Sequence, residues 1–343
     1  MSVFSNCGQT KLSLFFLLAG LLLASACSGS SLSSESAYVV PEKIRLKNST
    51  AQAARGIGEL KSGDRVTITE RSKSEDGTPW VNVKAADGQE GWAEAKNFIK
   101  EDIVAKSRKM ADEIKDIPTQ AIGKSKATLK LRLTPDRTTE ENVAAPLPSG
   151  TIMEIVARER KPRPASLDQK AESAEGAASD SKQETKYDEW LQVRLSGLTV
   201  LPAGWIYGGS VELDIPGEII YFVSSGRRIV GWQKLGTVHG DDSRTGDHFL
   251  VLERKVIDAD DRADFDRIKV LAYDAPTRNY TTPFKDDVIG RFPISVKMDG
   301  QSGSFRAIVL DKNDAKQEIE YSVEIMNNKV KAAKPAAQKM DKK

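Results

Sequence analysis

The chain contains very little cysteine or histidine. Its two cysteines are Cys7 and Cys27, and its two histidines are His239 and His248. The first 26 residues have the features of a targeting segment that is removed, so the mature chain keeps one thiol and has no internal disulfide. The fold must therefore be stabilised by apolar burial, and Cys27 is the one thiol left for chemistry that needs a cysteine.

Long apolar runs and surplus charge are also scarce. Residues 12–26, "LSLFFLLAGLLLASA", follow Lys11 as an apolar segment that is shorter than the ~20 residues of a membrane span. No later stretch reaches about 18 apolar residues. The charges nearly balance, with 51 basic and 49 acidic residues. We therefore expect no nucleic-acid partner.

The end of the targeting segment, "LASAC", resembles the lipobox of bacterial lipoproteins. In that family the cysteine, here Cys27, is acylated and becomes the new N-terminus. The match departs from the pattern at Ala24, where leucine is commonest, and the alternative is an ordinary secretory peptide that leaves Cys27 free. The resemblance implies a membrane anchor in the cell envelope, at the inner or outer membrane. The serine-rich residues 27–37 would then be a tether.

The first half of the chain repeats a β-rich pattern. Gly63 matches Gly150, and the tryptophans match in pairs: Trp80 with Trp190, and Trp92 with Trp205. The interval from glycine to the first tryptophan is 17 residues in one copy and 40 in the other. The surplus lies in residues 158–187, which are charged and have no apolar periodicity. We predict a disordered insert there.

Both copies resemble bacterial SH3-like (SH3b) domains, over residues 38–100 and 125–215. The family pattern is an early "LR" strand, a "GD-x-V" strand, a "W-x-x-V" strand and a closing "G-W-[VI]". The first copy inverts the early pair as Arg45-Leu46, whereas the second keeps it as Leu131-Arg132. The resemblance implies two small barrels that bind cell-wall ligands.

The remaining segments complete the predicted architecture. Residues 101–124 have helical spacing and predict a helical connector, in which Pro118 ends the helix. Residues 217–328 alternate apolar and polar side chains and predict an antiparallel, sandwich-like sheet. Residues 329–343 carry six lysines and predict a disordered basic tail. The fold class is therefore mainly β: two SH3-like barrels joined by a helix, then a C-terminal β-sandwich-like domain.

The aromatic residues of the repeats are the candidate site. We expect Trp80 and Trp190 to lie inside the barrels, because a small barrel has a thin core that one large ring fills. The glycines before Trp92 and Trp205 favour these two as walls of a groove at the rim. The ligand-groove candidates, including the first pair if their rings face outward, are Trp80, Trp92, Trp190, Trp205, Tyr38 and Tyr207.

Several enzyme classes are excluded by residues that are missing. SH3b domains are often fused to cell-wall hydrolases, but NlpC/P60-type amidases and L,D-transpeptidases need a catalytic cysteine, which a lipid-linked Cys27 cannot supply. No G-x-S-x-G, H-x-H or H-E-x-x-H motif occurs. Carboxylate pairs of the glycosidase type are not excluded. A hydrolase with its site in residues 217–328 therefore stays open as an alternative.

One loop resembles a metal site in composition. His239, Asp241, Asp242, Asp247 and His248 lie close together in the sequence, and such ligands suit a transition metal. Turns also favour glycine and aspartate, and we expect a polar hairpin here and no cofactor. The expected function is non-enzymatic binding of peptidoglycan, its peptide stems or a cell-wall protein. The remaining alternative is a protein-binding surface lipoprotein, adhesin or scaffold.

Overall fold

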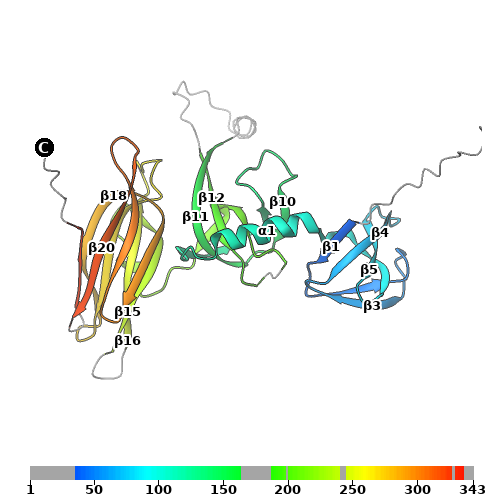
Figure 1. Ribbon diagram of the computed structural model, residues 1–343, viewed down its shortest axis with the longest axis horizontal. Coiled ribbons are helices and arrows are strands. Elements are labelled where there is room, and N and C mark those ends of the chain that lie inside the picture. The colour runs from blue at the N-terminus through cyan, green and yellow to red at the C-terminus, as the bar shows by residue number, and fades with distance from the viewer. Residues whose placement is uncertain (1–34, 164–186, 198–199, 240–244, 327–328, 336–343) are drawn as a thin grey trace, which may run out of the picture.

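The computed structural model describes residues 35–163, 187–197, 200–239, 245–326 and 329–335. Figure 1 shows three β units in a row, with one α-helix running beside the first two. We call them the N-terminal, central and C-terminal units. The fold is mainly β, and the strand pairs within the described ranges are antiparallel. This confirms the predicted fold class.

The N-terminal unit is a seven-stranded sheet around one apolar core. Its strands alternate buried and outward side chains, as the sequence pattern predicts. The strand order is β3-β2-β6-β5-β4-β1-β7. The strands are β1 (Glu35–Val39), β2 (Lys43–Lys47), β3 (Gly56–Lys61), β4 (Arg65–Lys73), β5 (Pro79–Ala85), β6 (Glu90–Glu94) and β7 (Phe98–Lys100).

The central unit repeats this topology strand for strand, in the order β10-β9-β13-β12-β11-β8-β14. Gly63 and Gly150 occupy the same turn before the fourth strand of each unit, with φ of 89° and 84°, a conformation that favours glycine. The strands are β8 (Ala121–Ser125), β9 (Leu129–Arg132), β10 (Val143–Leu147), β11 (Ile152–Pro162), β12 (Tyr187–Arg194), β13 (Ala203–Tyr207) and β14 (Val211–Leu213).

Helix α1 (Glu101–Ile114) joins the two units and packs against the central one. Ser107 is fully buried and its hydroxyl donates to the backbone oxygen of Ala203 at 2.6 Å. At the other end, the Arg194 guanidinium donates to the carbonyl of Ile114 at 3.1 Å and to that of Ile117 at 2.8 Å. A cation bonded to the last carbonyls stabilises a helix C-terminus. The connector is therefore a docked element.

The C-terminal unit is a seven-stranded meander in consecutive order. The sheet packs on two apolar cores, and in the larger one the rings of Phe305 and Tyr321 stack at 4.6 Å. The strands are β15 (Arg227–His239), β16 (Thr245–Lys255), β17 (Phe265–Asp274), β18 (Asn279–Asp299), β19 (Ser302–Leu310), β20 (Lys316–Met326) and β21 (Lys329–Ala333).

Several predicted boundaries need correction. The helix ends at Ile114 and not at Pro118, and β8 already belongs to the central sheet, so the connector is shorter than residues 101–124. The expected insert begins too early, because its first residues continue β11 through Pro162. The tail also begins too early: β21 pairs with β20 and buries Val330. Residues 164–186 and Cys27 lie outside the described residues.

Gln120 links the central unit to the C-terminal unit. It is fully buried, and its side-chain amide donates to the backbone oxygen of Ile294 at 3.0 Å and accepts from its nitrogen at 2.8 Å. Its own backbone donates to Ile155 at 2.8 Å and accepts from Trp232 at 2.9 Å. One residue therefore hydrogen-bonds to both sheets.

Replacing Gln120 by alanine is expected to destabilise the protein by about 1–3 kcal/mol, because the buried Ile294 amide N–H loses its partner, while the Ile294 carbonyl keeps the Gln233 side chain at 3.0 Å. Hydrogen exchange at the Ile294 and Trp232 amides should accelerate, while amides of the N-terminal unit keep their rates. The exposed Gln317→Ala is the control. Unchanged exchange at Ile294 would contradict the assigned link.

Candidate functional site

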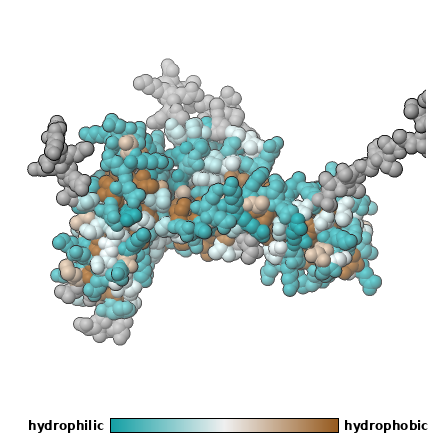
Figure 2. Space-filling view, in the orientation of Figure 1, coloured by the Kyte–Doolittle hydropathy of each residue, from teal (hydrophilic) through white to brown (hydrophobic). Residues whose placement is uncertain are grey.

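The face of the molecule drawn in Figure 2 has few apolar candidates for a binding site. Figure 2 shows a mostly hydrophilic face with small, separate apolar patches. The tryptophans that the repeat singles out lie on the outer faces of the N-terminal and central sheets. The candidate binding site is therefore sought on these two outer faces.

Trp80 and Trp92 share the outer face of the N-terminal sheet. Val81 and Val83 point into the core at 1% and 0% exposure, so Trp80 points outward by strand alternation. Trp80 on β5 lies opposite Glu94 on β6, and Asn82 lies opposite Trp92. The two rings are thus diagonal neighbours across one strand pair, and both are half-buried.

Lys47 places a positive charge on this aromatic face. It lies opposite Trp92 across β2 and β6, and its Nζ is 5.3 Å from the centroid of the Trp80 ring. An ammonium group at this distance is attracted to the ring face. Beside it, Asn82 donates to Glu90 at 3.1 Å. The aromatic face, defined as Lys47, Trp80, Asn82 and Trp92, can stack on a ligand and pair with a negative charge.

The central unit presents a matching set of residues at the same register. Trp190 lies opposite Tyr207, and Gln192 lies opposite Trp205. Arg132 lies opposite Trp205 from the other side, in the position of Lys47. The Trp190 and Tyr207 rings meet edge to face at 6.1 Å. The two units therefore carry equivalent faces, with Tyr207 in place of Glu94.

The central face is closed, and Trp190 is only 1% exposed. Arg132 is buried and donates to the Thr139 carbonyl at 2.7 Å and the Asn142 side chain at 2.6 Å, which holds the loop between β9 and β10 in place. From this loop, the Arg137 guanidinium lies 4.9 Å from the Tyr207 ring centroid. The loop thus covers Trp190, whereas the equivalent ring of Trp80 in the N-terminal unit stays half-exposed.

A pocket of about 340 Å³ remains beside Trp190, between this loop and the β11–β12 hairpin. Asp188 lies at its wall with 1% exposure, 2.7 Å from Arg137 and 3.1 Å from Arg163. The Asp188 carboxylate is therefore already neutralised by protein cations. Its lining residues are Pro135, Asp136, Arg137, Thr138, Lys161, Pro162, Asp188 and Trp190.

The structure shows where each candidate residue lies. Trp80 and Trp190 both lie on outer faces and not inside the barrels as predicted: Trp80 is half-buried, and Trp190 is buried only because a loop covers it. Trp92 and Trp205 are half-buried on the outer faces. Tyr38 is not a neighbour of the tryptophans: it packs against the helix, with Arg108 5.0 Å from its ring centroid.

Lys47, Arg132 and Asp188 were missed in the sequence. Lys47 is the last residue of β2 and Arg132 is the last residue of β9. An alignment of the two copies therefore matches these two residues. Nothing in the sequence shows that the two side chains have different tasks. One cation lies on a tryptophan ring, whereas the other holds a loop.

The expected metal loop is only partly described, because Asp241 and Asp242 lie outside the described residues. His248 is fully buried in β16, and its Nδ1 accepts a hydrogen bond from the Tyr273 backbone at 3.0 Å. Burial lowers the pKa of His248, which keeps the ring neutral. Within the ranges the structure describes, no three His, Cys, Asp or Glu side chains cluster as a metal site.

Within the same ranges, no helix combines the length and apolar character needed to cross a membrane.

Residues 44–99 match the bacterial SH3 domain family (SH3_3). No curated protein matches the sequence. The structure of NlpC2 from Trichomonas vaginalis is similar at a TM-score of 0.16 and 10% identity, over 54% of this chain and 51% of that one. This chain thus spans about half the length of that structure, and a TM-score this low carries no functional conclusion.

Proposed function

We propose that this protein is a non-enzymatic component of the bacterial cell envelope that binds peptidoglycan or its peptide stems through the aromatic face of the N-terminal unit. A bacterial SH3 domain is consistent with binding to the cell wall, and residues 44–99 match that family. The observation that carries the proposal is the pairing of Trp80 and Trp92 with Lys47 on this domain.

The proposed mechanism uses three kinds of contact. The half-buried rings offer apolar area at little conformational cost, because their strands fix them. Lys47 supplies a cation for the carboxylates of a peptide stem. β3 lies at the edge of its sheet, where backbone amides can pair with an extended peptide. Together these contacts suit a short anionic peptide better than a neutral polymer.

We propose that the central unit is a second SH3-like domain, because its strand order and pair register repeat those of the first. Its equivalent face is closed by the Arg132-held loop. We therefore expect one wall-binding face per chain and no avidity from tandem binding. The central unit would position the other two units.

We also propose that the protein is anchored by a lipid on Cys27, with the described units in the periplasm or on the cell surface. The support is the lipobox resemblance and the serine-rich residues that follow it. Mass spectrometry of the protein extracted from membranes tests this proposal. A diacylated or triacylated N-terminal cysteine is expected, whereas cleavage after Ala26 with a free thiol would contradict it.

Co-sedimentation with purified sacculi tests the proposed function. The full mature chain should pellet with sacculi, and Trp92→Ala should raise the apparent Kd by at least about tenfold. Trp205→Ala is the matched control, because Trp205 has the same register in the central unit. It should bind like the native chain, and melting curves would show that both variants fold.

Two outcomes would favour the alternatives. A folded chain that stays in the supernatant would favour a protein-binding surface lipoprotein, adhesin or scaffold. New muropeptides after incubation with sacculi would favour a hydrolase with a site in the C-terminal unit.

A further inference from the structure

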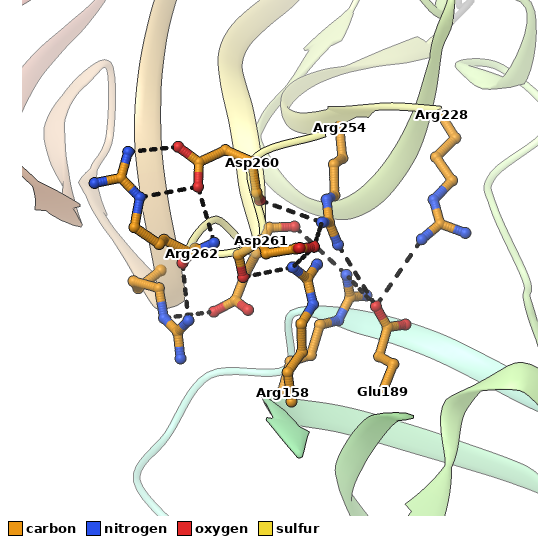
Figure 3. A network of polar contacts seen from close by, with 10 residues as sticks. Arg158, Glu189, Arg228, Arg254, Asp260, Asp261 and Arg262 are labelled. Atoms are coloured by element: carbon orange, nitrogen blue, oxygen red, sulfur yellow. Dashed lines mark hydrogen bonds and ion pairs between the residues drawn. The ribbon is translucent and has the colours of Figure 1, made fainter. Parts of the chain in front are cut away.

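Ten charged residues meet where the β11–β12 hairpin packs on the C-terminal unit. Figure 3 shows arginines from both units pointing toward Glu189 and the 260–262 loop. We call this set the seam cluster. Its members are Arg158, Arg160, Glu189, Arg228, Arg254, Asp260, Asp261, Arg262, Asp264 and Arg291.

The carboxylates do not balance the arginines of the seam cluster. Arg262 pairs with Asp260 at 2.7 Å and with Asp314, outside the cluster, at 2.5 Å. Arg291 lies 3.3 Å from Asp264. Four arginines then share the two carboxylates that are left. Those six residues are Arg158, Arg160, Arg228, Arg254, Glu189 and Asp261.

Arg160 donates to the Asp261 carbonyl at 2.6 Å and to its carboxylate at 3.4 Å, whereas the ion pairs of Glu189 are long. Glu189 Oε2 lies 3.6 Å from Arg158, 3.9 Å from Arg228 and 3.8 Å from Arg254, beyond the length of a hydrogen bond. One carboxylate is thus surrounded by three guanidinium groups and is hydrogen-bonded to none of them. Such contacts offset little of the desolvation that buried cations suffer.

Three of the arginines are buried and keep unused donors. The side chains of Arg158, Arg160 and Arg254 are 3%, 9% and 7% exposed. Arg158 Nε, Arg254 Nε and Arg160 Nη2 have no hydrogen-bond partner among the described residues. Burial lowers the pKa of Arg160, since desolvation opposes its charge. Buried cations with free donors normally face an anion.

We propose that the seam cluster binds an oxyanion of the phosphate class. With Asp314 counted, six arginines face five carboxylates, so one positive charge is left for an anion, and guanidinium groups donate paired hydrogen bonds to phosphate oxygens. The side chains of Glu189 and Arg228 are 25% and 57% exposed, so the cluster opens to solvent there. The phosphate would be free or part of a larger molecule, such as a lipid headgroup.

Inorganic phosphate is the first probe, added to the full chain at fixed ionic strength and pH 7.5. The melting midpoint should rise with phosphate and saturate, by about 5 °C at a hundredfold excess over Kd. Titration calorimetry should give one site per chain. A second arm adds vesicles that contain phosphatidic acid or only phosphatidylcholine, and selective binding to the first identifies a headgroup.

Two variants at the solvent opening decide the assignment. Arg228→Met removes an exposed cation that the fold does not need, and should weaken phosphate binding at least tenfold. Glu189→Gln removes the competing carboxylate and should strengthen it. Arg306→Met, on the exposed face of β19, is the control and should change nothing. The site is wrong if phosphate and phosphatidic acid act no differently from chloride and phosphatidylcholine, or if Arg228→Met binds like the native chain.

This proposal is independent of the aromatic face, because the two sites lie in different units. Failure of sacculus binding would leave the seam cluster untouched. Equally, a chain that does not bind phosphate can still bind the cell wall.

Discussion

Replacing Trp190 by alanine should lower the free energy of unfolding of the central unit by about 3–5 kcal/mol. The ring is 1% exposed and packs on Tyr207. Its loss would leave a cavity under the loop that Arg132 holds, and that hydrogen-bonded loop cannot easily collapse into the space. Calorimetry and urea unfolding followed by far-UV circular dichroism measure the effect.

Trp80→Ala is the matched variant, because Trp80 occupies the same register in the N-terminal unit. Its ring is half-buried with solvent on one side, so removal should cost less than about 1.5 kcal/mol. The two variants should separate stability from binding: Trp190→Ala unfolds more easily, whereas Trp80→Ala loses sacculus binding. Equal losses of stability would show that the two faces are not open and closed as described.

Replacing Lys269 by methionine should destabilise the C-terminal unit by about 3–5 kcal/mol. Lys269 and Glu253 form an ion pair of 2.6 Å, with side chains only 5% and 0% exposed. Lys269 also donates to the Phe222 carbonyl, and Glu253 accepts from the Ser224 amide at 2.9 Å. The variant would leave a buried carboxylate without its counter-ion. Urea unfolding of the full chain measures the loss.

A second substitution tests the cause of that loss. The double variant Lys269→Met with Glu253→Leu removes both charges and should recover much of the lost stability, because the stranded carboxylate is gone. Lys234→Met is the control: its pair with Asp247 is 2.9 Å long but half-exposed, and should contribute less than about 1 kcal/mol. A double variant as unstable as Lys269→Met would assign the loss to packing.

Local patterns in the sequence were sufficient to predict much of the fold. Alternating side chains predicted the strands, because strand periodicity depends only on neighbouring residues. The matching of Gly63 with Gly150 located one turn in both units, since both glycines have positive φ. The apolar spacing of residues 103–117 predicted helix α1, although it ends earlier than expected.

The state of each aromatic face could not be predicted in this way. Trp80 and Trp190 occupy identical motifs, and they differ because Arg132 and Asn142 fasten a loop over one of them. The seam cluster depends on contacts between distant segments: Arg158 and Asp264 are 106 residues apart in the chain. The periodicity of side chains along the sequence carries no information about pairs this far apart. Charge surplus at the seam is a property of the assembled units.

Gln120 has a mechanical consequence for a chain attached to a wall at one end, as proposed above. Its side chain and backbone join the central and C-terminal sheets in parallel, and the buried Ser107 ties the helix to the same central unit. A pulling force across the junction of the central and C-terminal units would have to break the bonds of Gln120 together. The central and C-terminal units would then transmit tension as one stiff body, with little slack between them.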